Sequence, residues 1–169
     1  MKIAILSDIH DNVWNLKKAL DMPELQNTDA LLFCGDLCAP FIIHLLGNGY
    51  PNPIHMVLGN NDGDVAAIIQ NIKQHPHIQL YGEYFRGDFN GKTVAMNHYP
   101  DKARELASLG IYDIVCYGHN HTLKKEKIGP TLMLNPGPIM GFHGGRFEDV
   151  PATFMVADTD KMQTEVFAV

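Results

Sequence analysis

The sequence predicts an α/β fold, a four-layer αββα sandwich in which helices flank two mixed β-sheets. Its first half alternates short aliphatic runs with segments of helical periodicity, which is typical of parallel strands joined by helical crossovers. Its second half carries three pairs of strand-like runs, each pair separated by a short turn, which is typical of antiparallel pairing. Two sheets packed face to face, with helices outside, accommodate both halves.

The first half is expected to form three strands and three helices. The helical pattern is clearest where Val13, Leu16 and Leu20 recur at helical spacing. Either Asp11 or Asn12 is available to cap that helix. The expected strands are Ile3–Leu6, Ala30–Cys34 and Ile54–Leu58, and the expected helices are Asn12–Leu20, Pro40–Leu46 and Asp64–Ile72.

The second half is expected to be rich in hairpins. The dipeptide Asn90-Gly91 is a strong hairpin signal, and Gly129-Pro130 marks a second turn. The expected strands are Glu83–Phe89, Lys92–Asn97, Asp113–Cys116, Leu123–Ile128, Thr131–Leu134, Ala152–Ala157 and Gln163–Phe167, with one helix at Asp101–Leu109.

The composition restricts the classes of function. A chain of 169 residues, 46% hydrophobic and 19% charged, is expected to form a single domain over 1–169. The net charge of −6 offers no basic surface for a long nucleic acid. No segment approaches the run of ~20 apolar residues that a membrane span needs. Three cysteines cannot make a disulfide framework, so a reducing, cytoplasmic location is expected.

Polar side chains cluster where five of the expected strands end. The clusters are Asp8 and His10, then Asp36, then Asn60, Asn61 and Asp62, then His98, and then His119 and His121. In open α/β sheets, ligands bind outside the carboxyl ends of the strands. The clusters are therefore expected to converge on one edge of the sheet.

The residue types in these clusters favour a metal site. Carboxylate, imidazole and amide oxygen are ligands for Mn, Fe, Zn, Co or Ni, and the absence of a thiolate cluster argues against structural zinc. Asp8 and His10 are one residue apart, so both side chains point to the same side of an extended strand end. His119 and His121 have the same spacing. Asp36 stands alone after a glycine, which suits a carboxylate that bridges two ions.

The order of these motifs resembles that of the calcineurin-like metallophosphoesterases. The resemblance is to the small single-domain archaeal and bacterial phosphodiesterases of that family, and it covers nearly the whole chain. The residues that carry it are Asp8-x-His10, Gly35-Asp36, Gly59-Asn60-x-Asp62, the strand-end His98, Gly118-His119-x-His121 and Asn135-Pro136-Gly137. Each motif is weak alone, but the first five of them, in this order, are specific.

The resemblance implies a dinuclear metal centre and a hydrolytic activity. It assigns Asp8, His10, Asp36 and His121 to a first metal, and Asp36, Asn60, His98 and His119 to a second, with Asp36 bridging. It implies that a hydroxide shared by two divalent ions attacks a small phosphate ester in line, with diesters favoured over monoesters. Manganese is the expected metal, with Ni, Fe, Co and Zn as alternatives.

The candidate catalytic and substrate-binding residues include one departure from the family pattern. Many members carry a histidine at the position of Asn61, and an asparagine can donate a hydrogen bond but cannot act as an acid. Asn61 and Asp62 are the catalytic candidates, with Asp62 expected to orient a ligand. Asn12, Asn61 and Arg146 are the candidates for substrate contact. The general acid for the leaving group is left open.

Other interpretations remain at this stage. The same fold serves as a scaffold subunit in a retromer-type complex, and a nuclease is a further alternative. The Gly-rich segment around His143 and Arg146 is expected to be a flexible loop, with phosphate contact by either residue as the alternative. Trp14 is expected in the core, with a position at the pocket rim as the alternative. A homodimer formed through an edge strand or the Phe142 segment is also left open.

Overall fold

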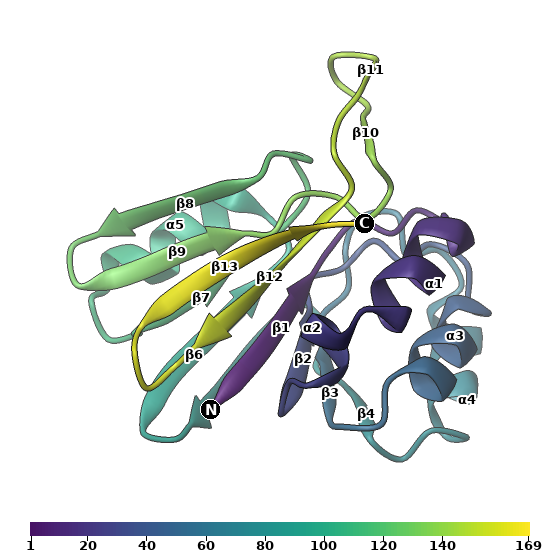
Figure 1. The fold of residues 1–169 in the computed structure, drawn as a ribbon, viewed down its shortest axis with the longest axis horizontal. Coiled ribbons are helices and arrows are strands. Elements are labelled where there is room, and N and C mark those ends of the chain that lie inside the picture. The colour runs from purple at the N-terminus through teal and green to yellow at the C-terminus, as the bar shows by residue number, and fades with distance from the viewer.

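The computed structural model describes residues 1–169 and confirms the predicted fold (Figure 1). Two mixed sheets of six and five strands pack face to face, and helices cover their outer faces. None of the helices has both the length and the apolar character that crossing a membrane requires.

The first sheet has the strand order β13-β12-β1-β2-β3-β4. Its members are β1 (Lys2–Leu6), β2 (Ala30–Phe33), β3 (Ile54–Met56), β4 (Ile78–Leu80), β12 (Thr153–Asp158) and β13 (Gln163–Ala168). Strands β1 to β4 run parallel, whereas β12 and β13 are antiparallel to their neighbours. The crossovers contain α1 (Val13–Asp21), α2 (Pro23–Gln26), α3 (Ile42–Gly49) and α4 (Val65–Ile72), which lie on one side of this sheet (Figure 1).

The second sheet has the strand order β5-β6-β7-β9-β8. Its members are β5 (Tyr84–Phe89), β6 (Lys92–Asn97), β7 (Ile114–Cys116), β8 (Lys124–Ile128) and β9 (Thr131–Asn135). The hairpins β5–β6 and β8–β9 are antiparallel, and β6, β7 and β9 run parallel. Helix α5 (Pro100–Ser108) connects β6 to β7 and covers the outer face.

Alternation along the strands creates three apolar layers. Ile3 and Ile5 of β1 belong to the core between the two sheets, whereas Ala4 and Leu6 belong to the core beneath α1 to α4. In β6, Val94 and Met96 face the first sheet, while Ala95 between them packs beneath α5. The layers hold the two sheets in a fixed relation, which fixes the relative position of their strand ends.

Some elements differ from the sequence prediction. Helix α3 begins at Ile42 instead of Pro40, because Ile42 and Ile43 first form a tight turn, donating backbone hydrogen bonds to Ala39 and Pro40. The short elements α2 and β4 were not predicted. The Gly-rich segment forms a two-stranded hairpin of β10 (Phe142–His143) and β11 (Glu148–Asp149), which stands out from the body of the fold (Figure 1).

Candidate metal centre

The candidate ligands lie on loops that leave the carboxyl ends of strands in both sheets. The loops after β1, β2 and β3 come from the first sheet, and those after β6 and β7 come from the second. The polar clusters were predicted to converge on one edge of a single sheet, whereas in the structure they come from the adjacent edges of two packed sheets. Backbone hydrogen bonds join the first two loops, from Asp8 N–H to the Gly35 carbonyl at 3.0 Å and from Ile9 N–H to the Asp36 carbonyl at 2.9 Å.

Five of the seven candidate ligands have left-handed backbone conformations. Their φ angles are +54° at Asp8, +44° at His10, +61° at Asp36, +72° at His119 and +50° at His121. Positive φ is uncommon for residues other than glycine, and it costs of order 1 kcal/mol or more at each residue. Such outliers concentrate at functional sites, and these loops hold seven of the ten residues other than glycine that have positive φ.

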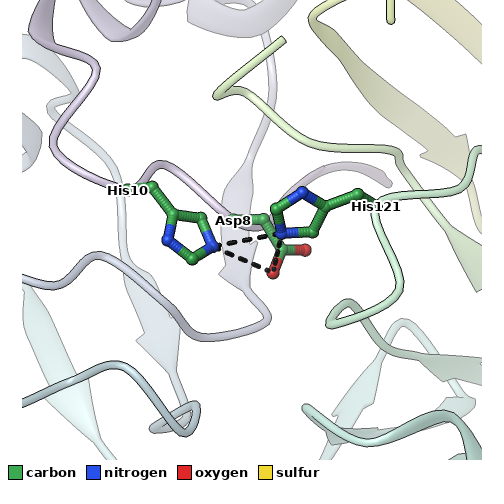
Figure 2. Close-up of side chains that lie close together, drawn as sticks. All are labelled: Asp8, His10 and His121. Carbon is green, nitrogen blue, oxygen red and sulfur yellow. Dashed lines mark hydrogen bonds and ion pairs between the residues drawn. The ribbon is translucent and has the colours of Figure 1, made fainter. Parts of the chain in front are cut away.

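The first donor group comprises Asp8, His10 and His121. Figure 2 shows the two imidazoles and the carboxylate turned toward one another. The Nε2 atoms of His10 and His121 lie 3.1 Å apart. Asp8 Oδ1 lies 3.5 Å from Nε2 of His121 and 3.9 Å from Nε2 of His10.

The second donor group forms around His98. Its Nε2 lies 3.2 Å from Asn60 Oδ1 and 3.3 Å from Asp36 Oδ2. The same amide oxygen of Asn60 lies 2.8 Å from Nδ1 of His119. Asp8 also approaches this group, because its carboxylate accepts the backbone N–H of His119 at 3.1 Å.

Asp36 lies between the two groups. Its Oδ2 is 3.4 Å from Nε2 of His10 and 3.3 Å from Nε2 of His98. Donor atoms that share one ion at bond lengths of about 2.1 Å are separated by roughly 3.0–3.5 Å in octahedral or tetrahedral geometry. Most of the donor separations within both groups fall in or near that range. The structure therefore brings all seven predicted ligands together, with Asp36 central.

Two imidazoles are oriented by backbone carbonyls. Nδ1–H of His98 donates to the Cys34 carbonyl, and Nδ1–H of His121 donates to the Phe142 carbonyl, both at 2.7 Å. A carbonyl only accepts, so Nδ1 carries the hydrogen and the Nε2 lone pair of a neutral ring faces the carboxylates. That lone pair needs a proton or a cation in front of it. The arrangement fits divalent metal ions held by O and N donors.

The electrostatics of the cluster follow from this crowding. Burial disfavours the charged rings of His98 and His121, but the nearby carboxylates outweigh it and raise the pKa of both. Burial likewise opposes charge on Asp36, but contacts with His98 and Asn61 outweigh it and hold the pKa of Asp36 well below its ordinary value. For His10 and His119, burial dominates and lowers the pKa.

Asn61 and Asp62 both act on Asp36, but in different ways. Asn61 donates its backbone N–H to Asp36 Oδ1 at 2.8 Å and its Nδ2 to Asp36 Oδ2 at 2.9 Å. The carboxylate of Asp62 accepts the backbone N–H groups of Asp36 at 3.1 Å, Cys38 at 2.9 Å and Gly59 at 2.7 Å. Asp62 thus ties the loop after β2 to the loop after β3. It does not line the cavity described next.

A cavity of about 450 Å³ opens beside the donor groups. It is lined by His10, Asn61, His119, Asn120, His121, Thr122, His143, Gly144 and Gly145. The lining contains no hydrophobic side chain, and it contains no lysine or arginine. Sequence reasoning missed Asn120 and Thr122 as lining residues. The signal in the sequence was their position, because Asn120 lies between His119 and His121 and Thr122 follows His121.

Two predicted substrate contacts lie outside this lining. Asn12 caps α1: its Oδ1 accepts the Asn15 backbone N–H at 3.1 Å, and its Nδ2 donates to the Met140 carbonyl at 2.9 Å. Arg146 pairs through Nε with Glu148 at 2.5 Å and lines a smaller neighbouring cavity of about 190 Å³. Asn12 is therefore the N-cap of α1, which was one of the two capping residues expected from the sequence.

Comparisons with known proteins identify the family of this chain. The model of the calcineurin-like phosphoesterase superfamily domain matches residues 1–162. A phosphodiesterase of Methanocaldococcus jannaschii is 30% identical over 165 residues, which cover 96% of each chain. A solved archaeal phosphodiesterase superposes with a TM-score of 0.88 at 27% identity, covering 100% of both chains. Vacuolar protein sorting 29 of Cryptosporidium parvum shares the fold, with a TM-score of 0.68 at 18% identity over 99% of this chain and 96% of its own. This chain belongs to the calcineurin-like phosphoesterase superfamily.

Proposed function

We propose that this protein hydrolyses small phosphodiesters with two divalent cations, preferably Mn²⁺, held by the loops at the carboxyl ends of strands from both sheets. The observation that carries the proposal is the position of the Asp36 carboxylate, whose Oδ2 lies within 3.4 Å of donor atoms from both groups. A single carboxylate oxygen facing two imidazole lone pairs is suited to bridging two cations. The family membership and the relative named as a phosphodiesterase support the same activity.

The proposed ligand sets follow the two donor groups. Asp8, His10, Asp36 and His121 hold one cation, and Asp36, Asn60, His98 and His119 hold the other. When bound, the two cations would supply positive charge to the phosphoryl group and lower the pKa of a water molecule toward about 7. The carbonyls of Cys34 and Phe142 keep the ligand lone pairs aimed at the cations.

A preference for diesters is supported by the charge of the cavity. A phosphodiester carries one negative charge, whereas a monoester carries up to two near neutral pH. Apart from the two proposed cations, the cavity lining has no lysine or arginine to offset a second charge. The amides and imidazoles that do line it are donors suited to a singly charged ester.

Metal titration tests the proposal directly. We expect calorimetric titration of metal-free protein with Mn²⁺ at about pH 8 to show two ions per chain. We expect the affinity to fall by roughly a hundredfold at about pH 5, because protons compete for the imidazoles. The raised pKa of His98 and His121 places the onset of this loss above the ordinary histidine value, whereas His10 and His119 protonate only at lower pH. A stoichiometry of one, or equal affinity at both pH values, would contradict the proposal.

Asn61 is expected to bias the enzyme toward esters with good leaving groups. Its amide is bonded to Asp36, and an amide cannot release a proton to a leaving alkoxide. We expect Asn61→His to improve hydrolysis of phenyl methyl phosphate roughly tenfold relative to 4-nitrophenyl methyl phosphate, which needs no protonation. Asn61→Ala should leave the leaving-group dependence as steep as in the wild type. If the rate depended on the leaving group equally in the wild type, Asn61→His and Asn61→Ala, the proposed effect of Asn61 on leaving-group preference would be wrong.

A further inference from the structure

The β10–β11 hairpin forms one wall of the cavity. His143, Gly144 and Gly145 line it together with the histidines of the metal centre. The ring of His143 lies edge-on to that of His121, with centroids 6.3 Å apart. A Cβ on Gly144 would meet no atom within 4 Å, so the wall beside His143 is open space. His143 is therefore placed to reach a molecule bound at the centre, although it belongs to neither donor group.

The backbone of the hairpin fixes the tautomer of His143. The backbone N–H of Arg146 is shared between two acceptors of His143, the backbone carbonyl at 3.1 Å and Nδ1 at 3.2 Å. A backbone N–H can only donate, so Nδ1 accepts and the ring hydrogen lies on Nε2. The two-stranded ladder holds this geometry, because Phe142 pairs with Asp149 and His143 pairs with Glu148.

Other polar groups in the lining are already engaged within the protein. The Asn61 amide donates to Asp36 Oδ2, and the Thr122 hydroxyl donates to the Asn120 carbonyl. The Asn120 side-chain oxygen accepts from Asn135. Nε2–H of His143 has no acceptor among the protein atoms, and neither does Nδ2 of Asn120. A hydrogen-bond donor left free at the wall of this cavity is suited to an anionic oxygen.

Building on the proposed phosphodiesterase function, we propose that His143 binds the phosphoryl group of the substrate as a neutral hydrogen-bond donor through Nε2. The neutral tautomer donates a hydrogen bond and keeps its proton. His143 therefore stabilises charge on the phosphoryl oxygens in the transition state and does not protonate the leaving group. The β10–β11 hairpin thus carries a substrate-binding residue in a cavity that lacks lysine and arginine.

Three variants test this role with Mn²⁺-loaded protein. We expect His143→Ala to lower kcat/KM for 4-nitrophenyl methyl phosphate roughly ten- to a hundredfold, since one hydrogen bond to a charged group is lost. We expect an equal loss for phenyl methyl phosphate, and partial recovery in His143→Gln, whose amide N–H can replace Nε2–H. Asp149→Asn is the matched control, because Asp149 lies on the same hairpin but does not line the cavity.

Two further readouts do not depend on turnover. Calorimetric titration with inorganic phosphate should show about tenfold weaker binding to His143→Ala and unchanged binding to Asp149→Asn. Nitrogen-15 spectra of histidine-labelled, metal-free protein should place the hydrogen of His143 on Nε2.

The outcomes separate this inference from the proposed function. Wild-type protein that binds Mn²⁺ but hydrolyses neither ester overturns the proposed function. Active wild-type protein with an equally active His143→Ala variant overturns only the role of His143. A loss that grows with the basicity of the leaving group, or a hydrogen found on Nδ1, overturns the neutral-donor role.

Discussion

Replacing Asp36 with asparagine is expected to lower phosphodiesterase activity by about a thousandfold or more. The substitution keeps the size of the side chain and leaves one oxygen to accept a hydrogen bond from Asn61. It removes the negative charge that lies between His10 and His98. Both proposed cations lose their shared ligand, so the expected metal content falls from two ions per chain to one or none. Activity and elemental content are measured on the same preparation.

The matched control for this variant is Asp21→Asn. Asp21 is an exposed residue at the end of α1, so the same chemical change there should leave activity and metal content unaltered. Asp36→Asn protein that binds two ions and retains activity would contradict the bridging role. Folded wild-type protein that binds metal and hydrolyses no phosphate ester would instead favour the scaffold interpretation of the fold.

Metal removal is expected to lower the melting temperature by about 10 °C. A ligand present at a thousand times its Kd stabilises the native state by ~4 kcal/mol. Each kcal/mol corresponds to about 2–4 °C in a domain of this size. Thermal melts of chelated and Mn²⁺-reconstituted protein measure the difference. A Ca²⁺ reconstitution is a useful control, because histidine nitrogens are poor ligands for calcium.

The stabilisation by metal is also expected to be larger at pH 8 than at pH 6. The raised pKa of His98 and His121 means that their protonated rings stabilise the metal-free fold. That contribution is fully present below the ordinary histidine value of about 6.5, and it is lost as the pH rises through the raised values. The lowered pKa of Asp36 contributes stability above the ordinary aspartate value, so it stays constant between pH 6 and 8. Melting shifts of equal size at both pH values would exclude this linkage.

The sequence predicted the two sheets and the loops that carry the candidate metal ligands, because both depend on local patterns. Aliphatic runs such as Ile3–Leu6 are long enough to identify buried strands, and each ends at a polar residue with a fixed role. The five clusters were expected to converge because carboxyl ends of strands are a known meeting point for ligands. What the sequence did not indicate is that the clusters come from two different sheets, since pairing between distant strands leaves no local signal.

Other features could not be predicted, for identifiable reasons. The hairpin β10–β11 has a ladder of only two residue pairs, and its glycines suggested a flexible loop. The expectation that Trp14 packs in the core was wrong, because its side chain is 74% exposed. The helical spacing that buries Leu16, Ala19 and Leu20 already places position 14 on the opposite side of α1. Helical periodicity, and not residue type, indicates the exposure of Trp14.

The left-handed conformations in the loops that carry the candidate ligands imply a compromise between the stability of the fold and its proposed function. At His119, with φ near +72°, a glycine would adopt the same backbone without its steric penalty. A chain shaped only for a robust fold would favour such replacements at several of these positions. The backbone of these loops is therefore strained. Replacing the residues with glycine would relieve the strain and stabilise the protein, but it would also remove the candidate cation ligands. The loops that lower the stability of the fold are the same loops that carry the ligands of the proposed cation site.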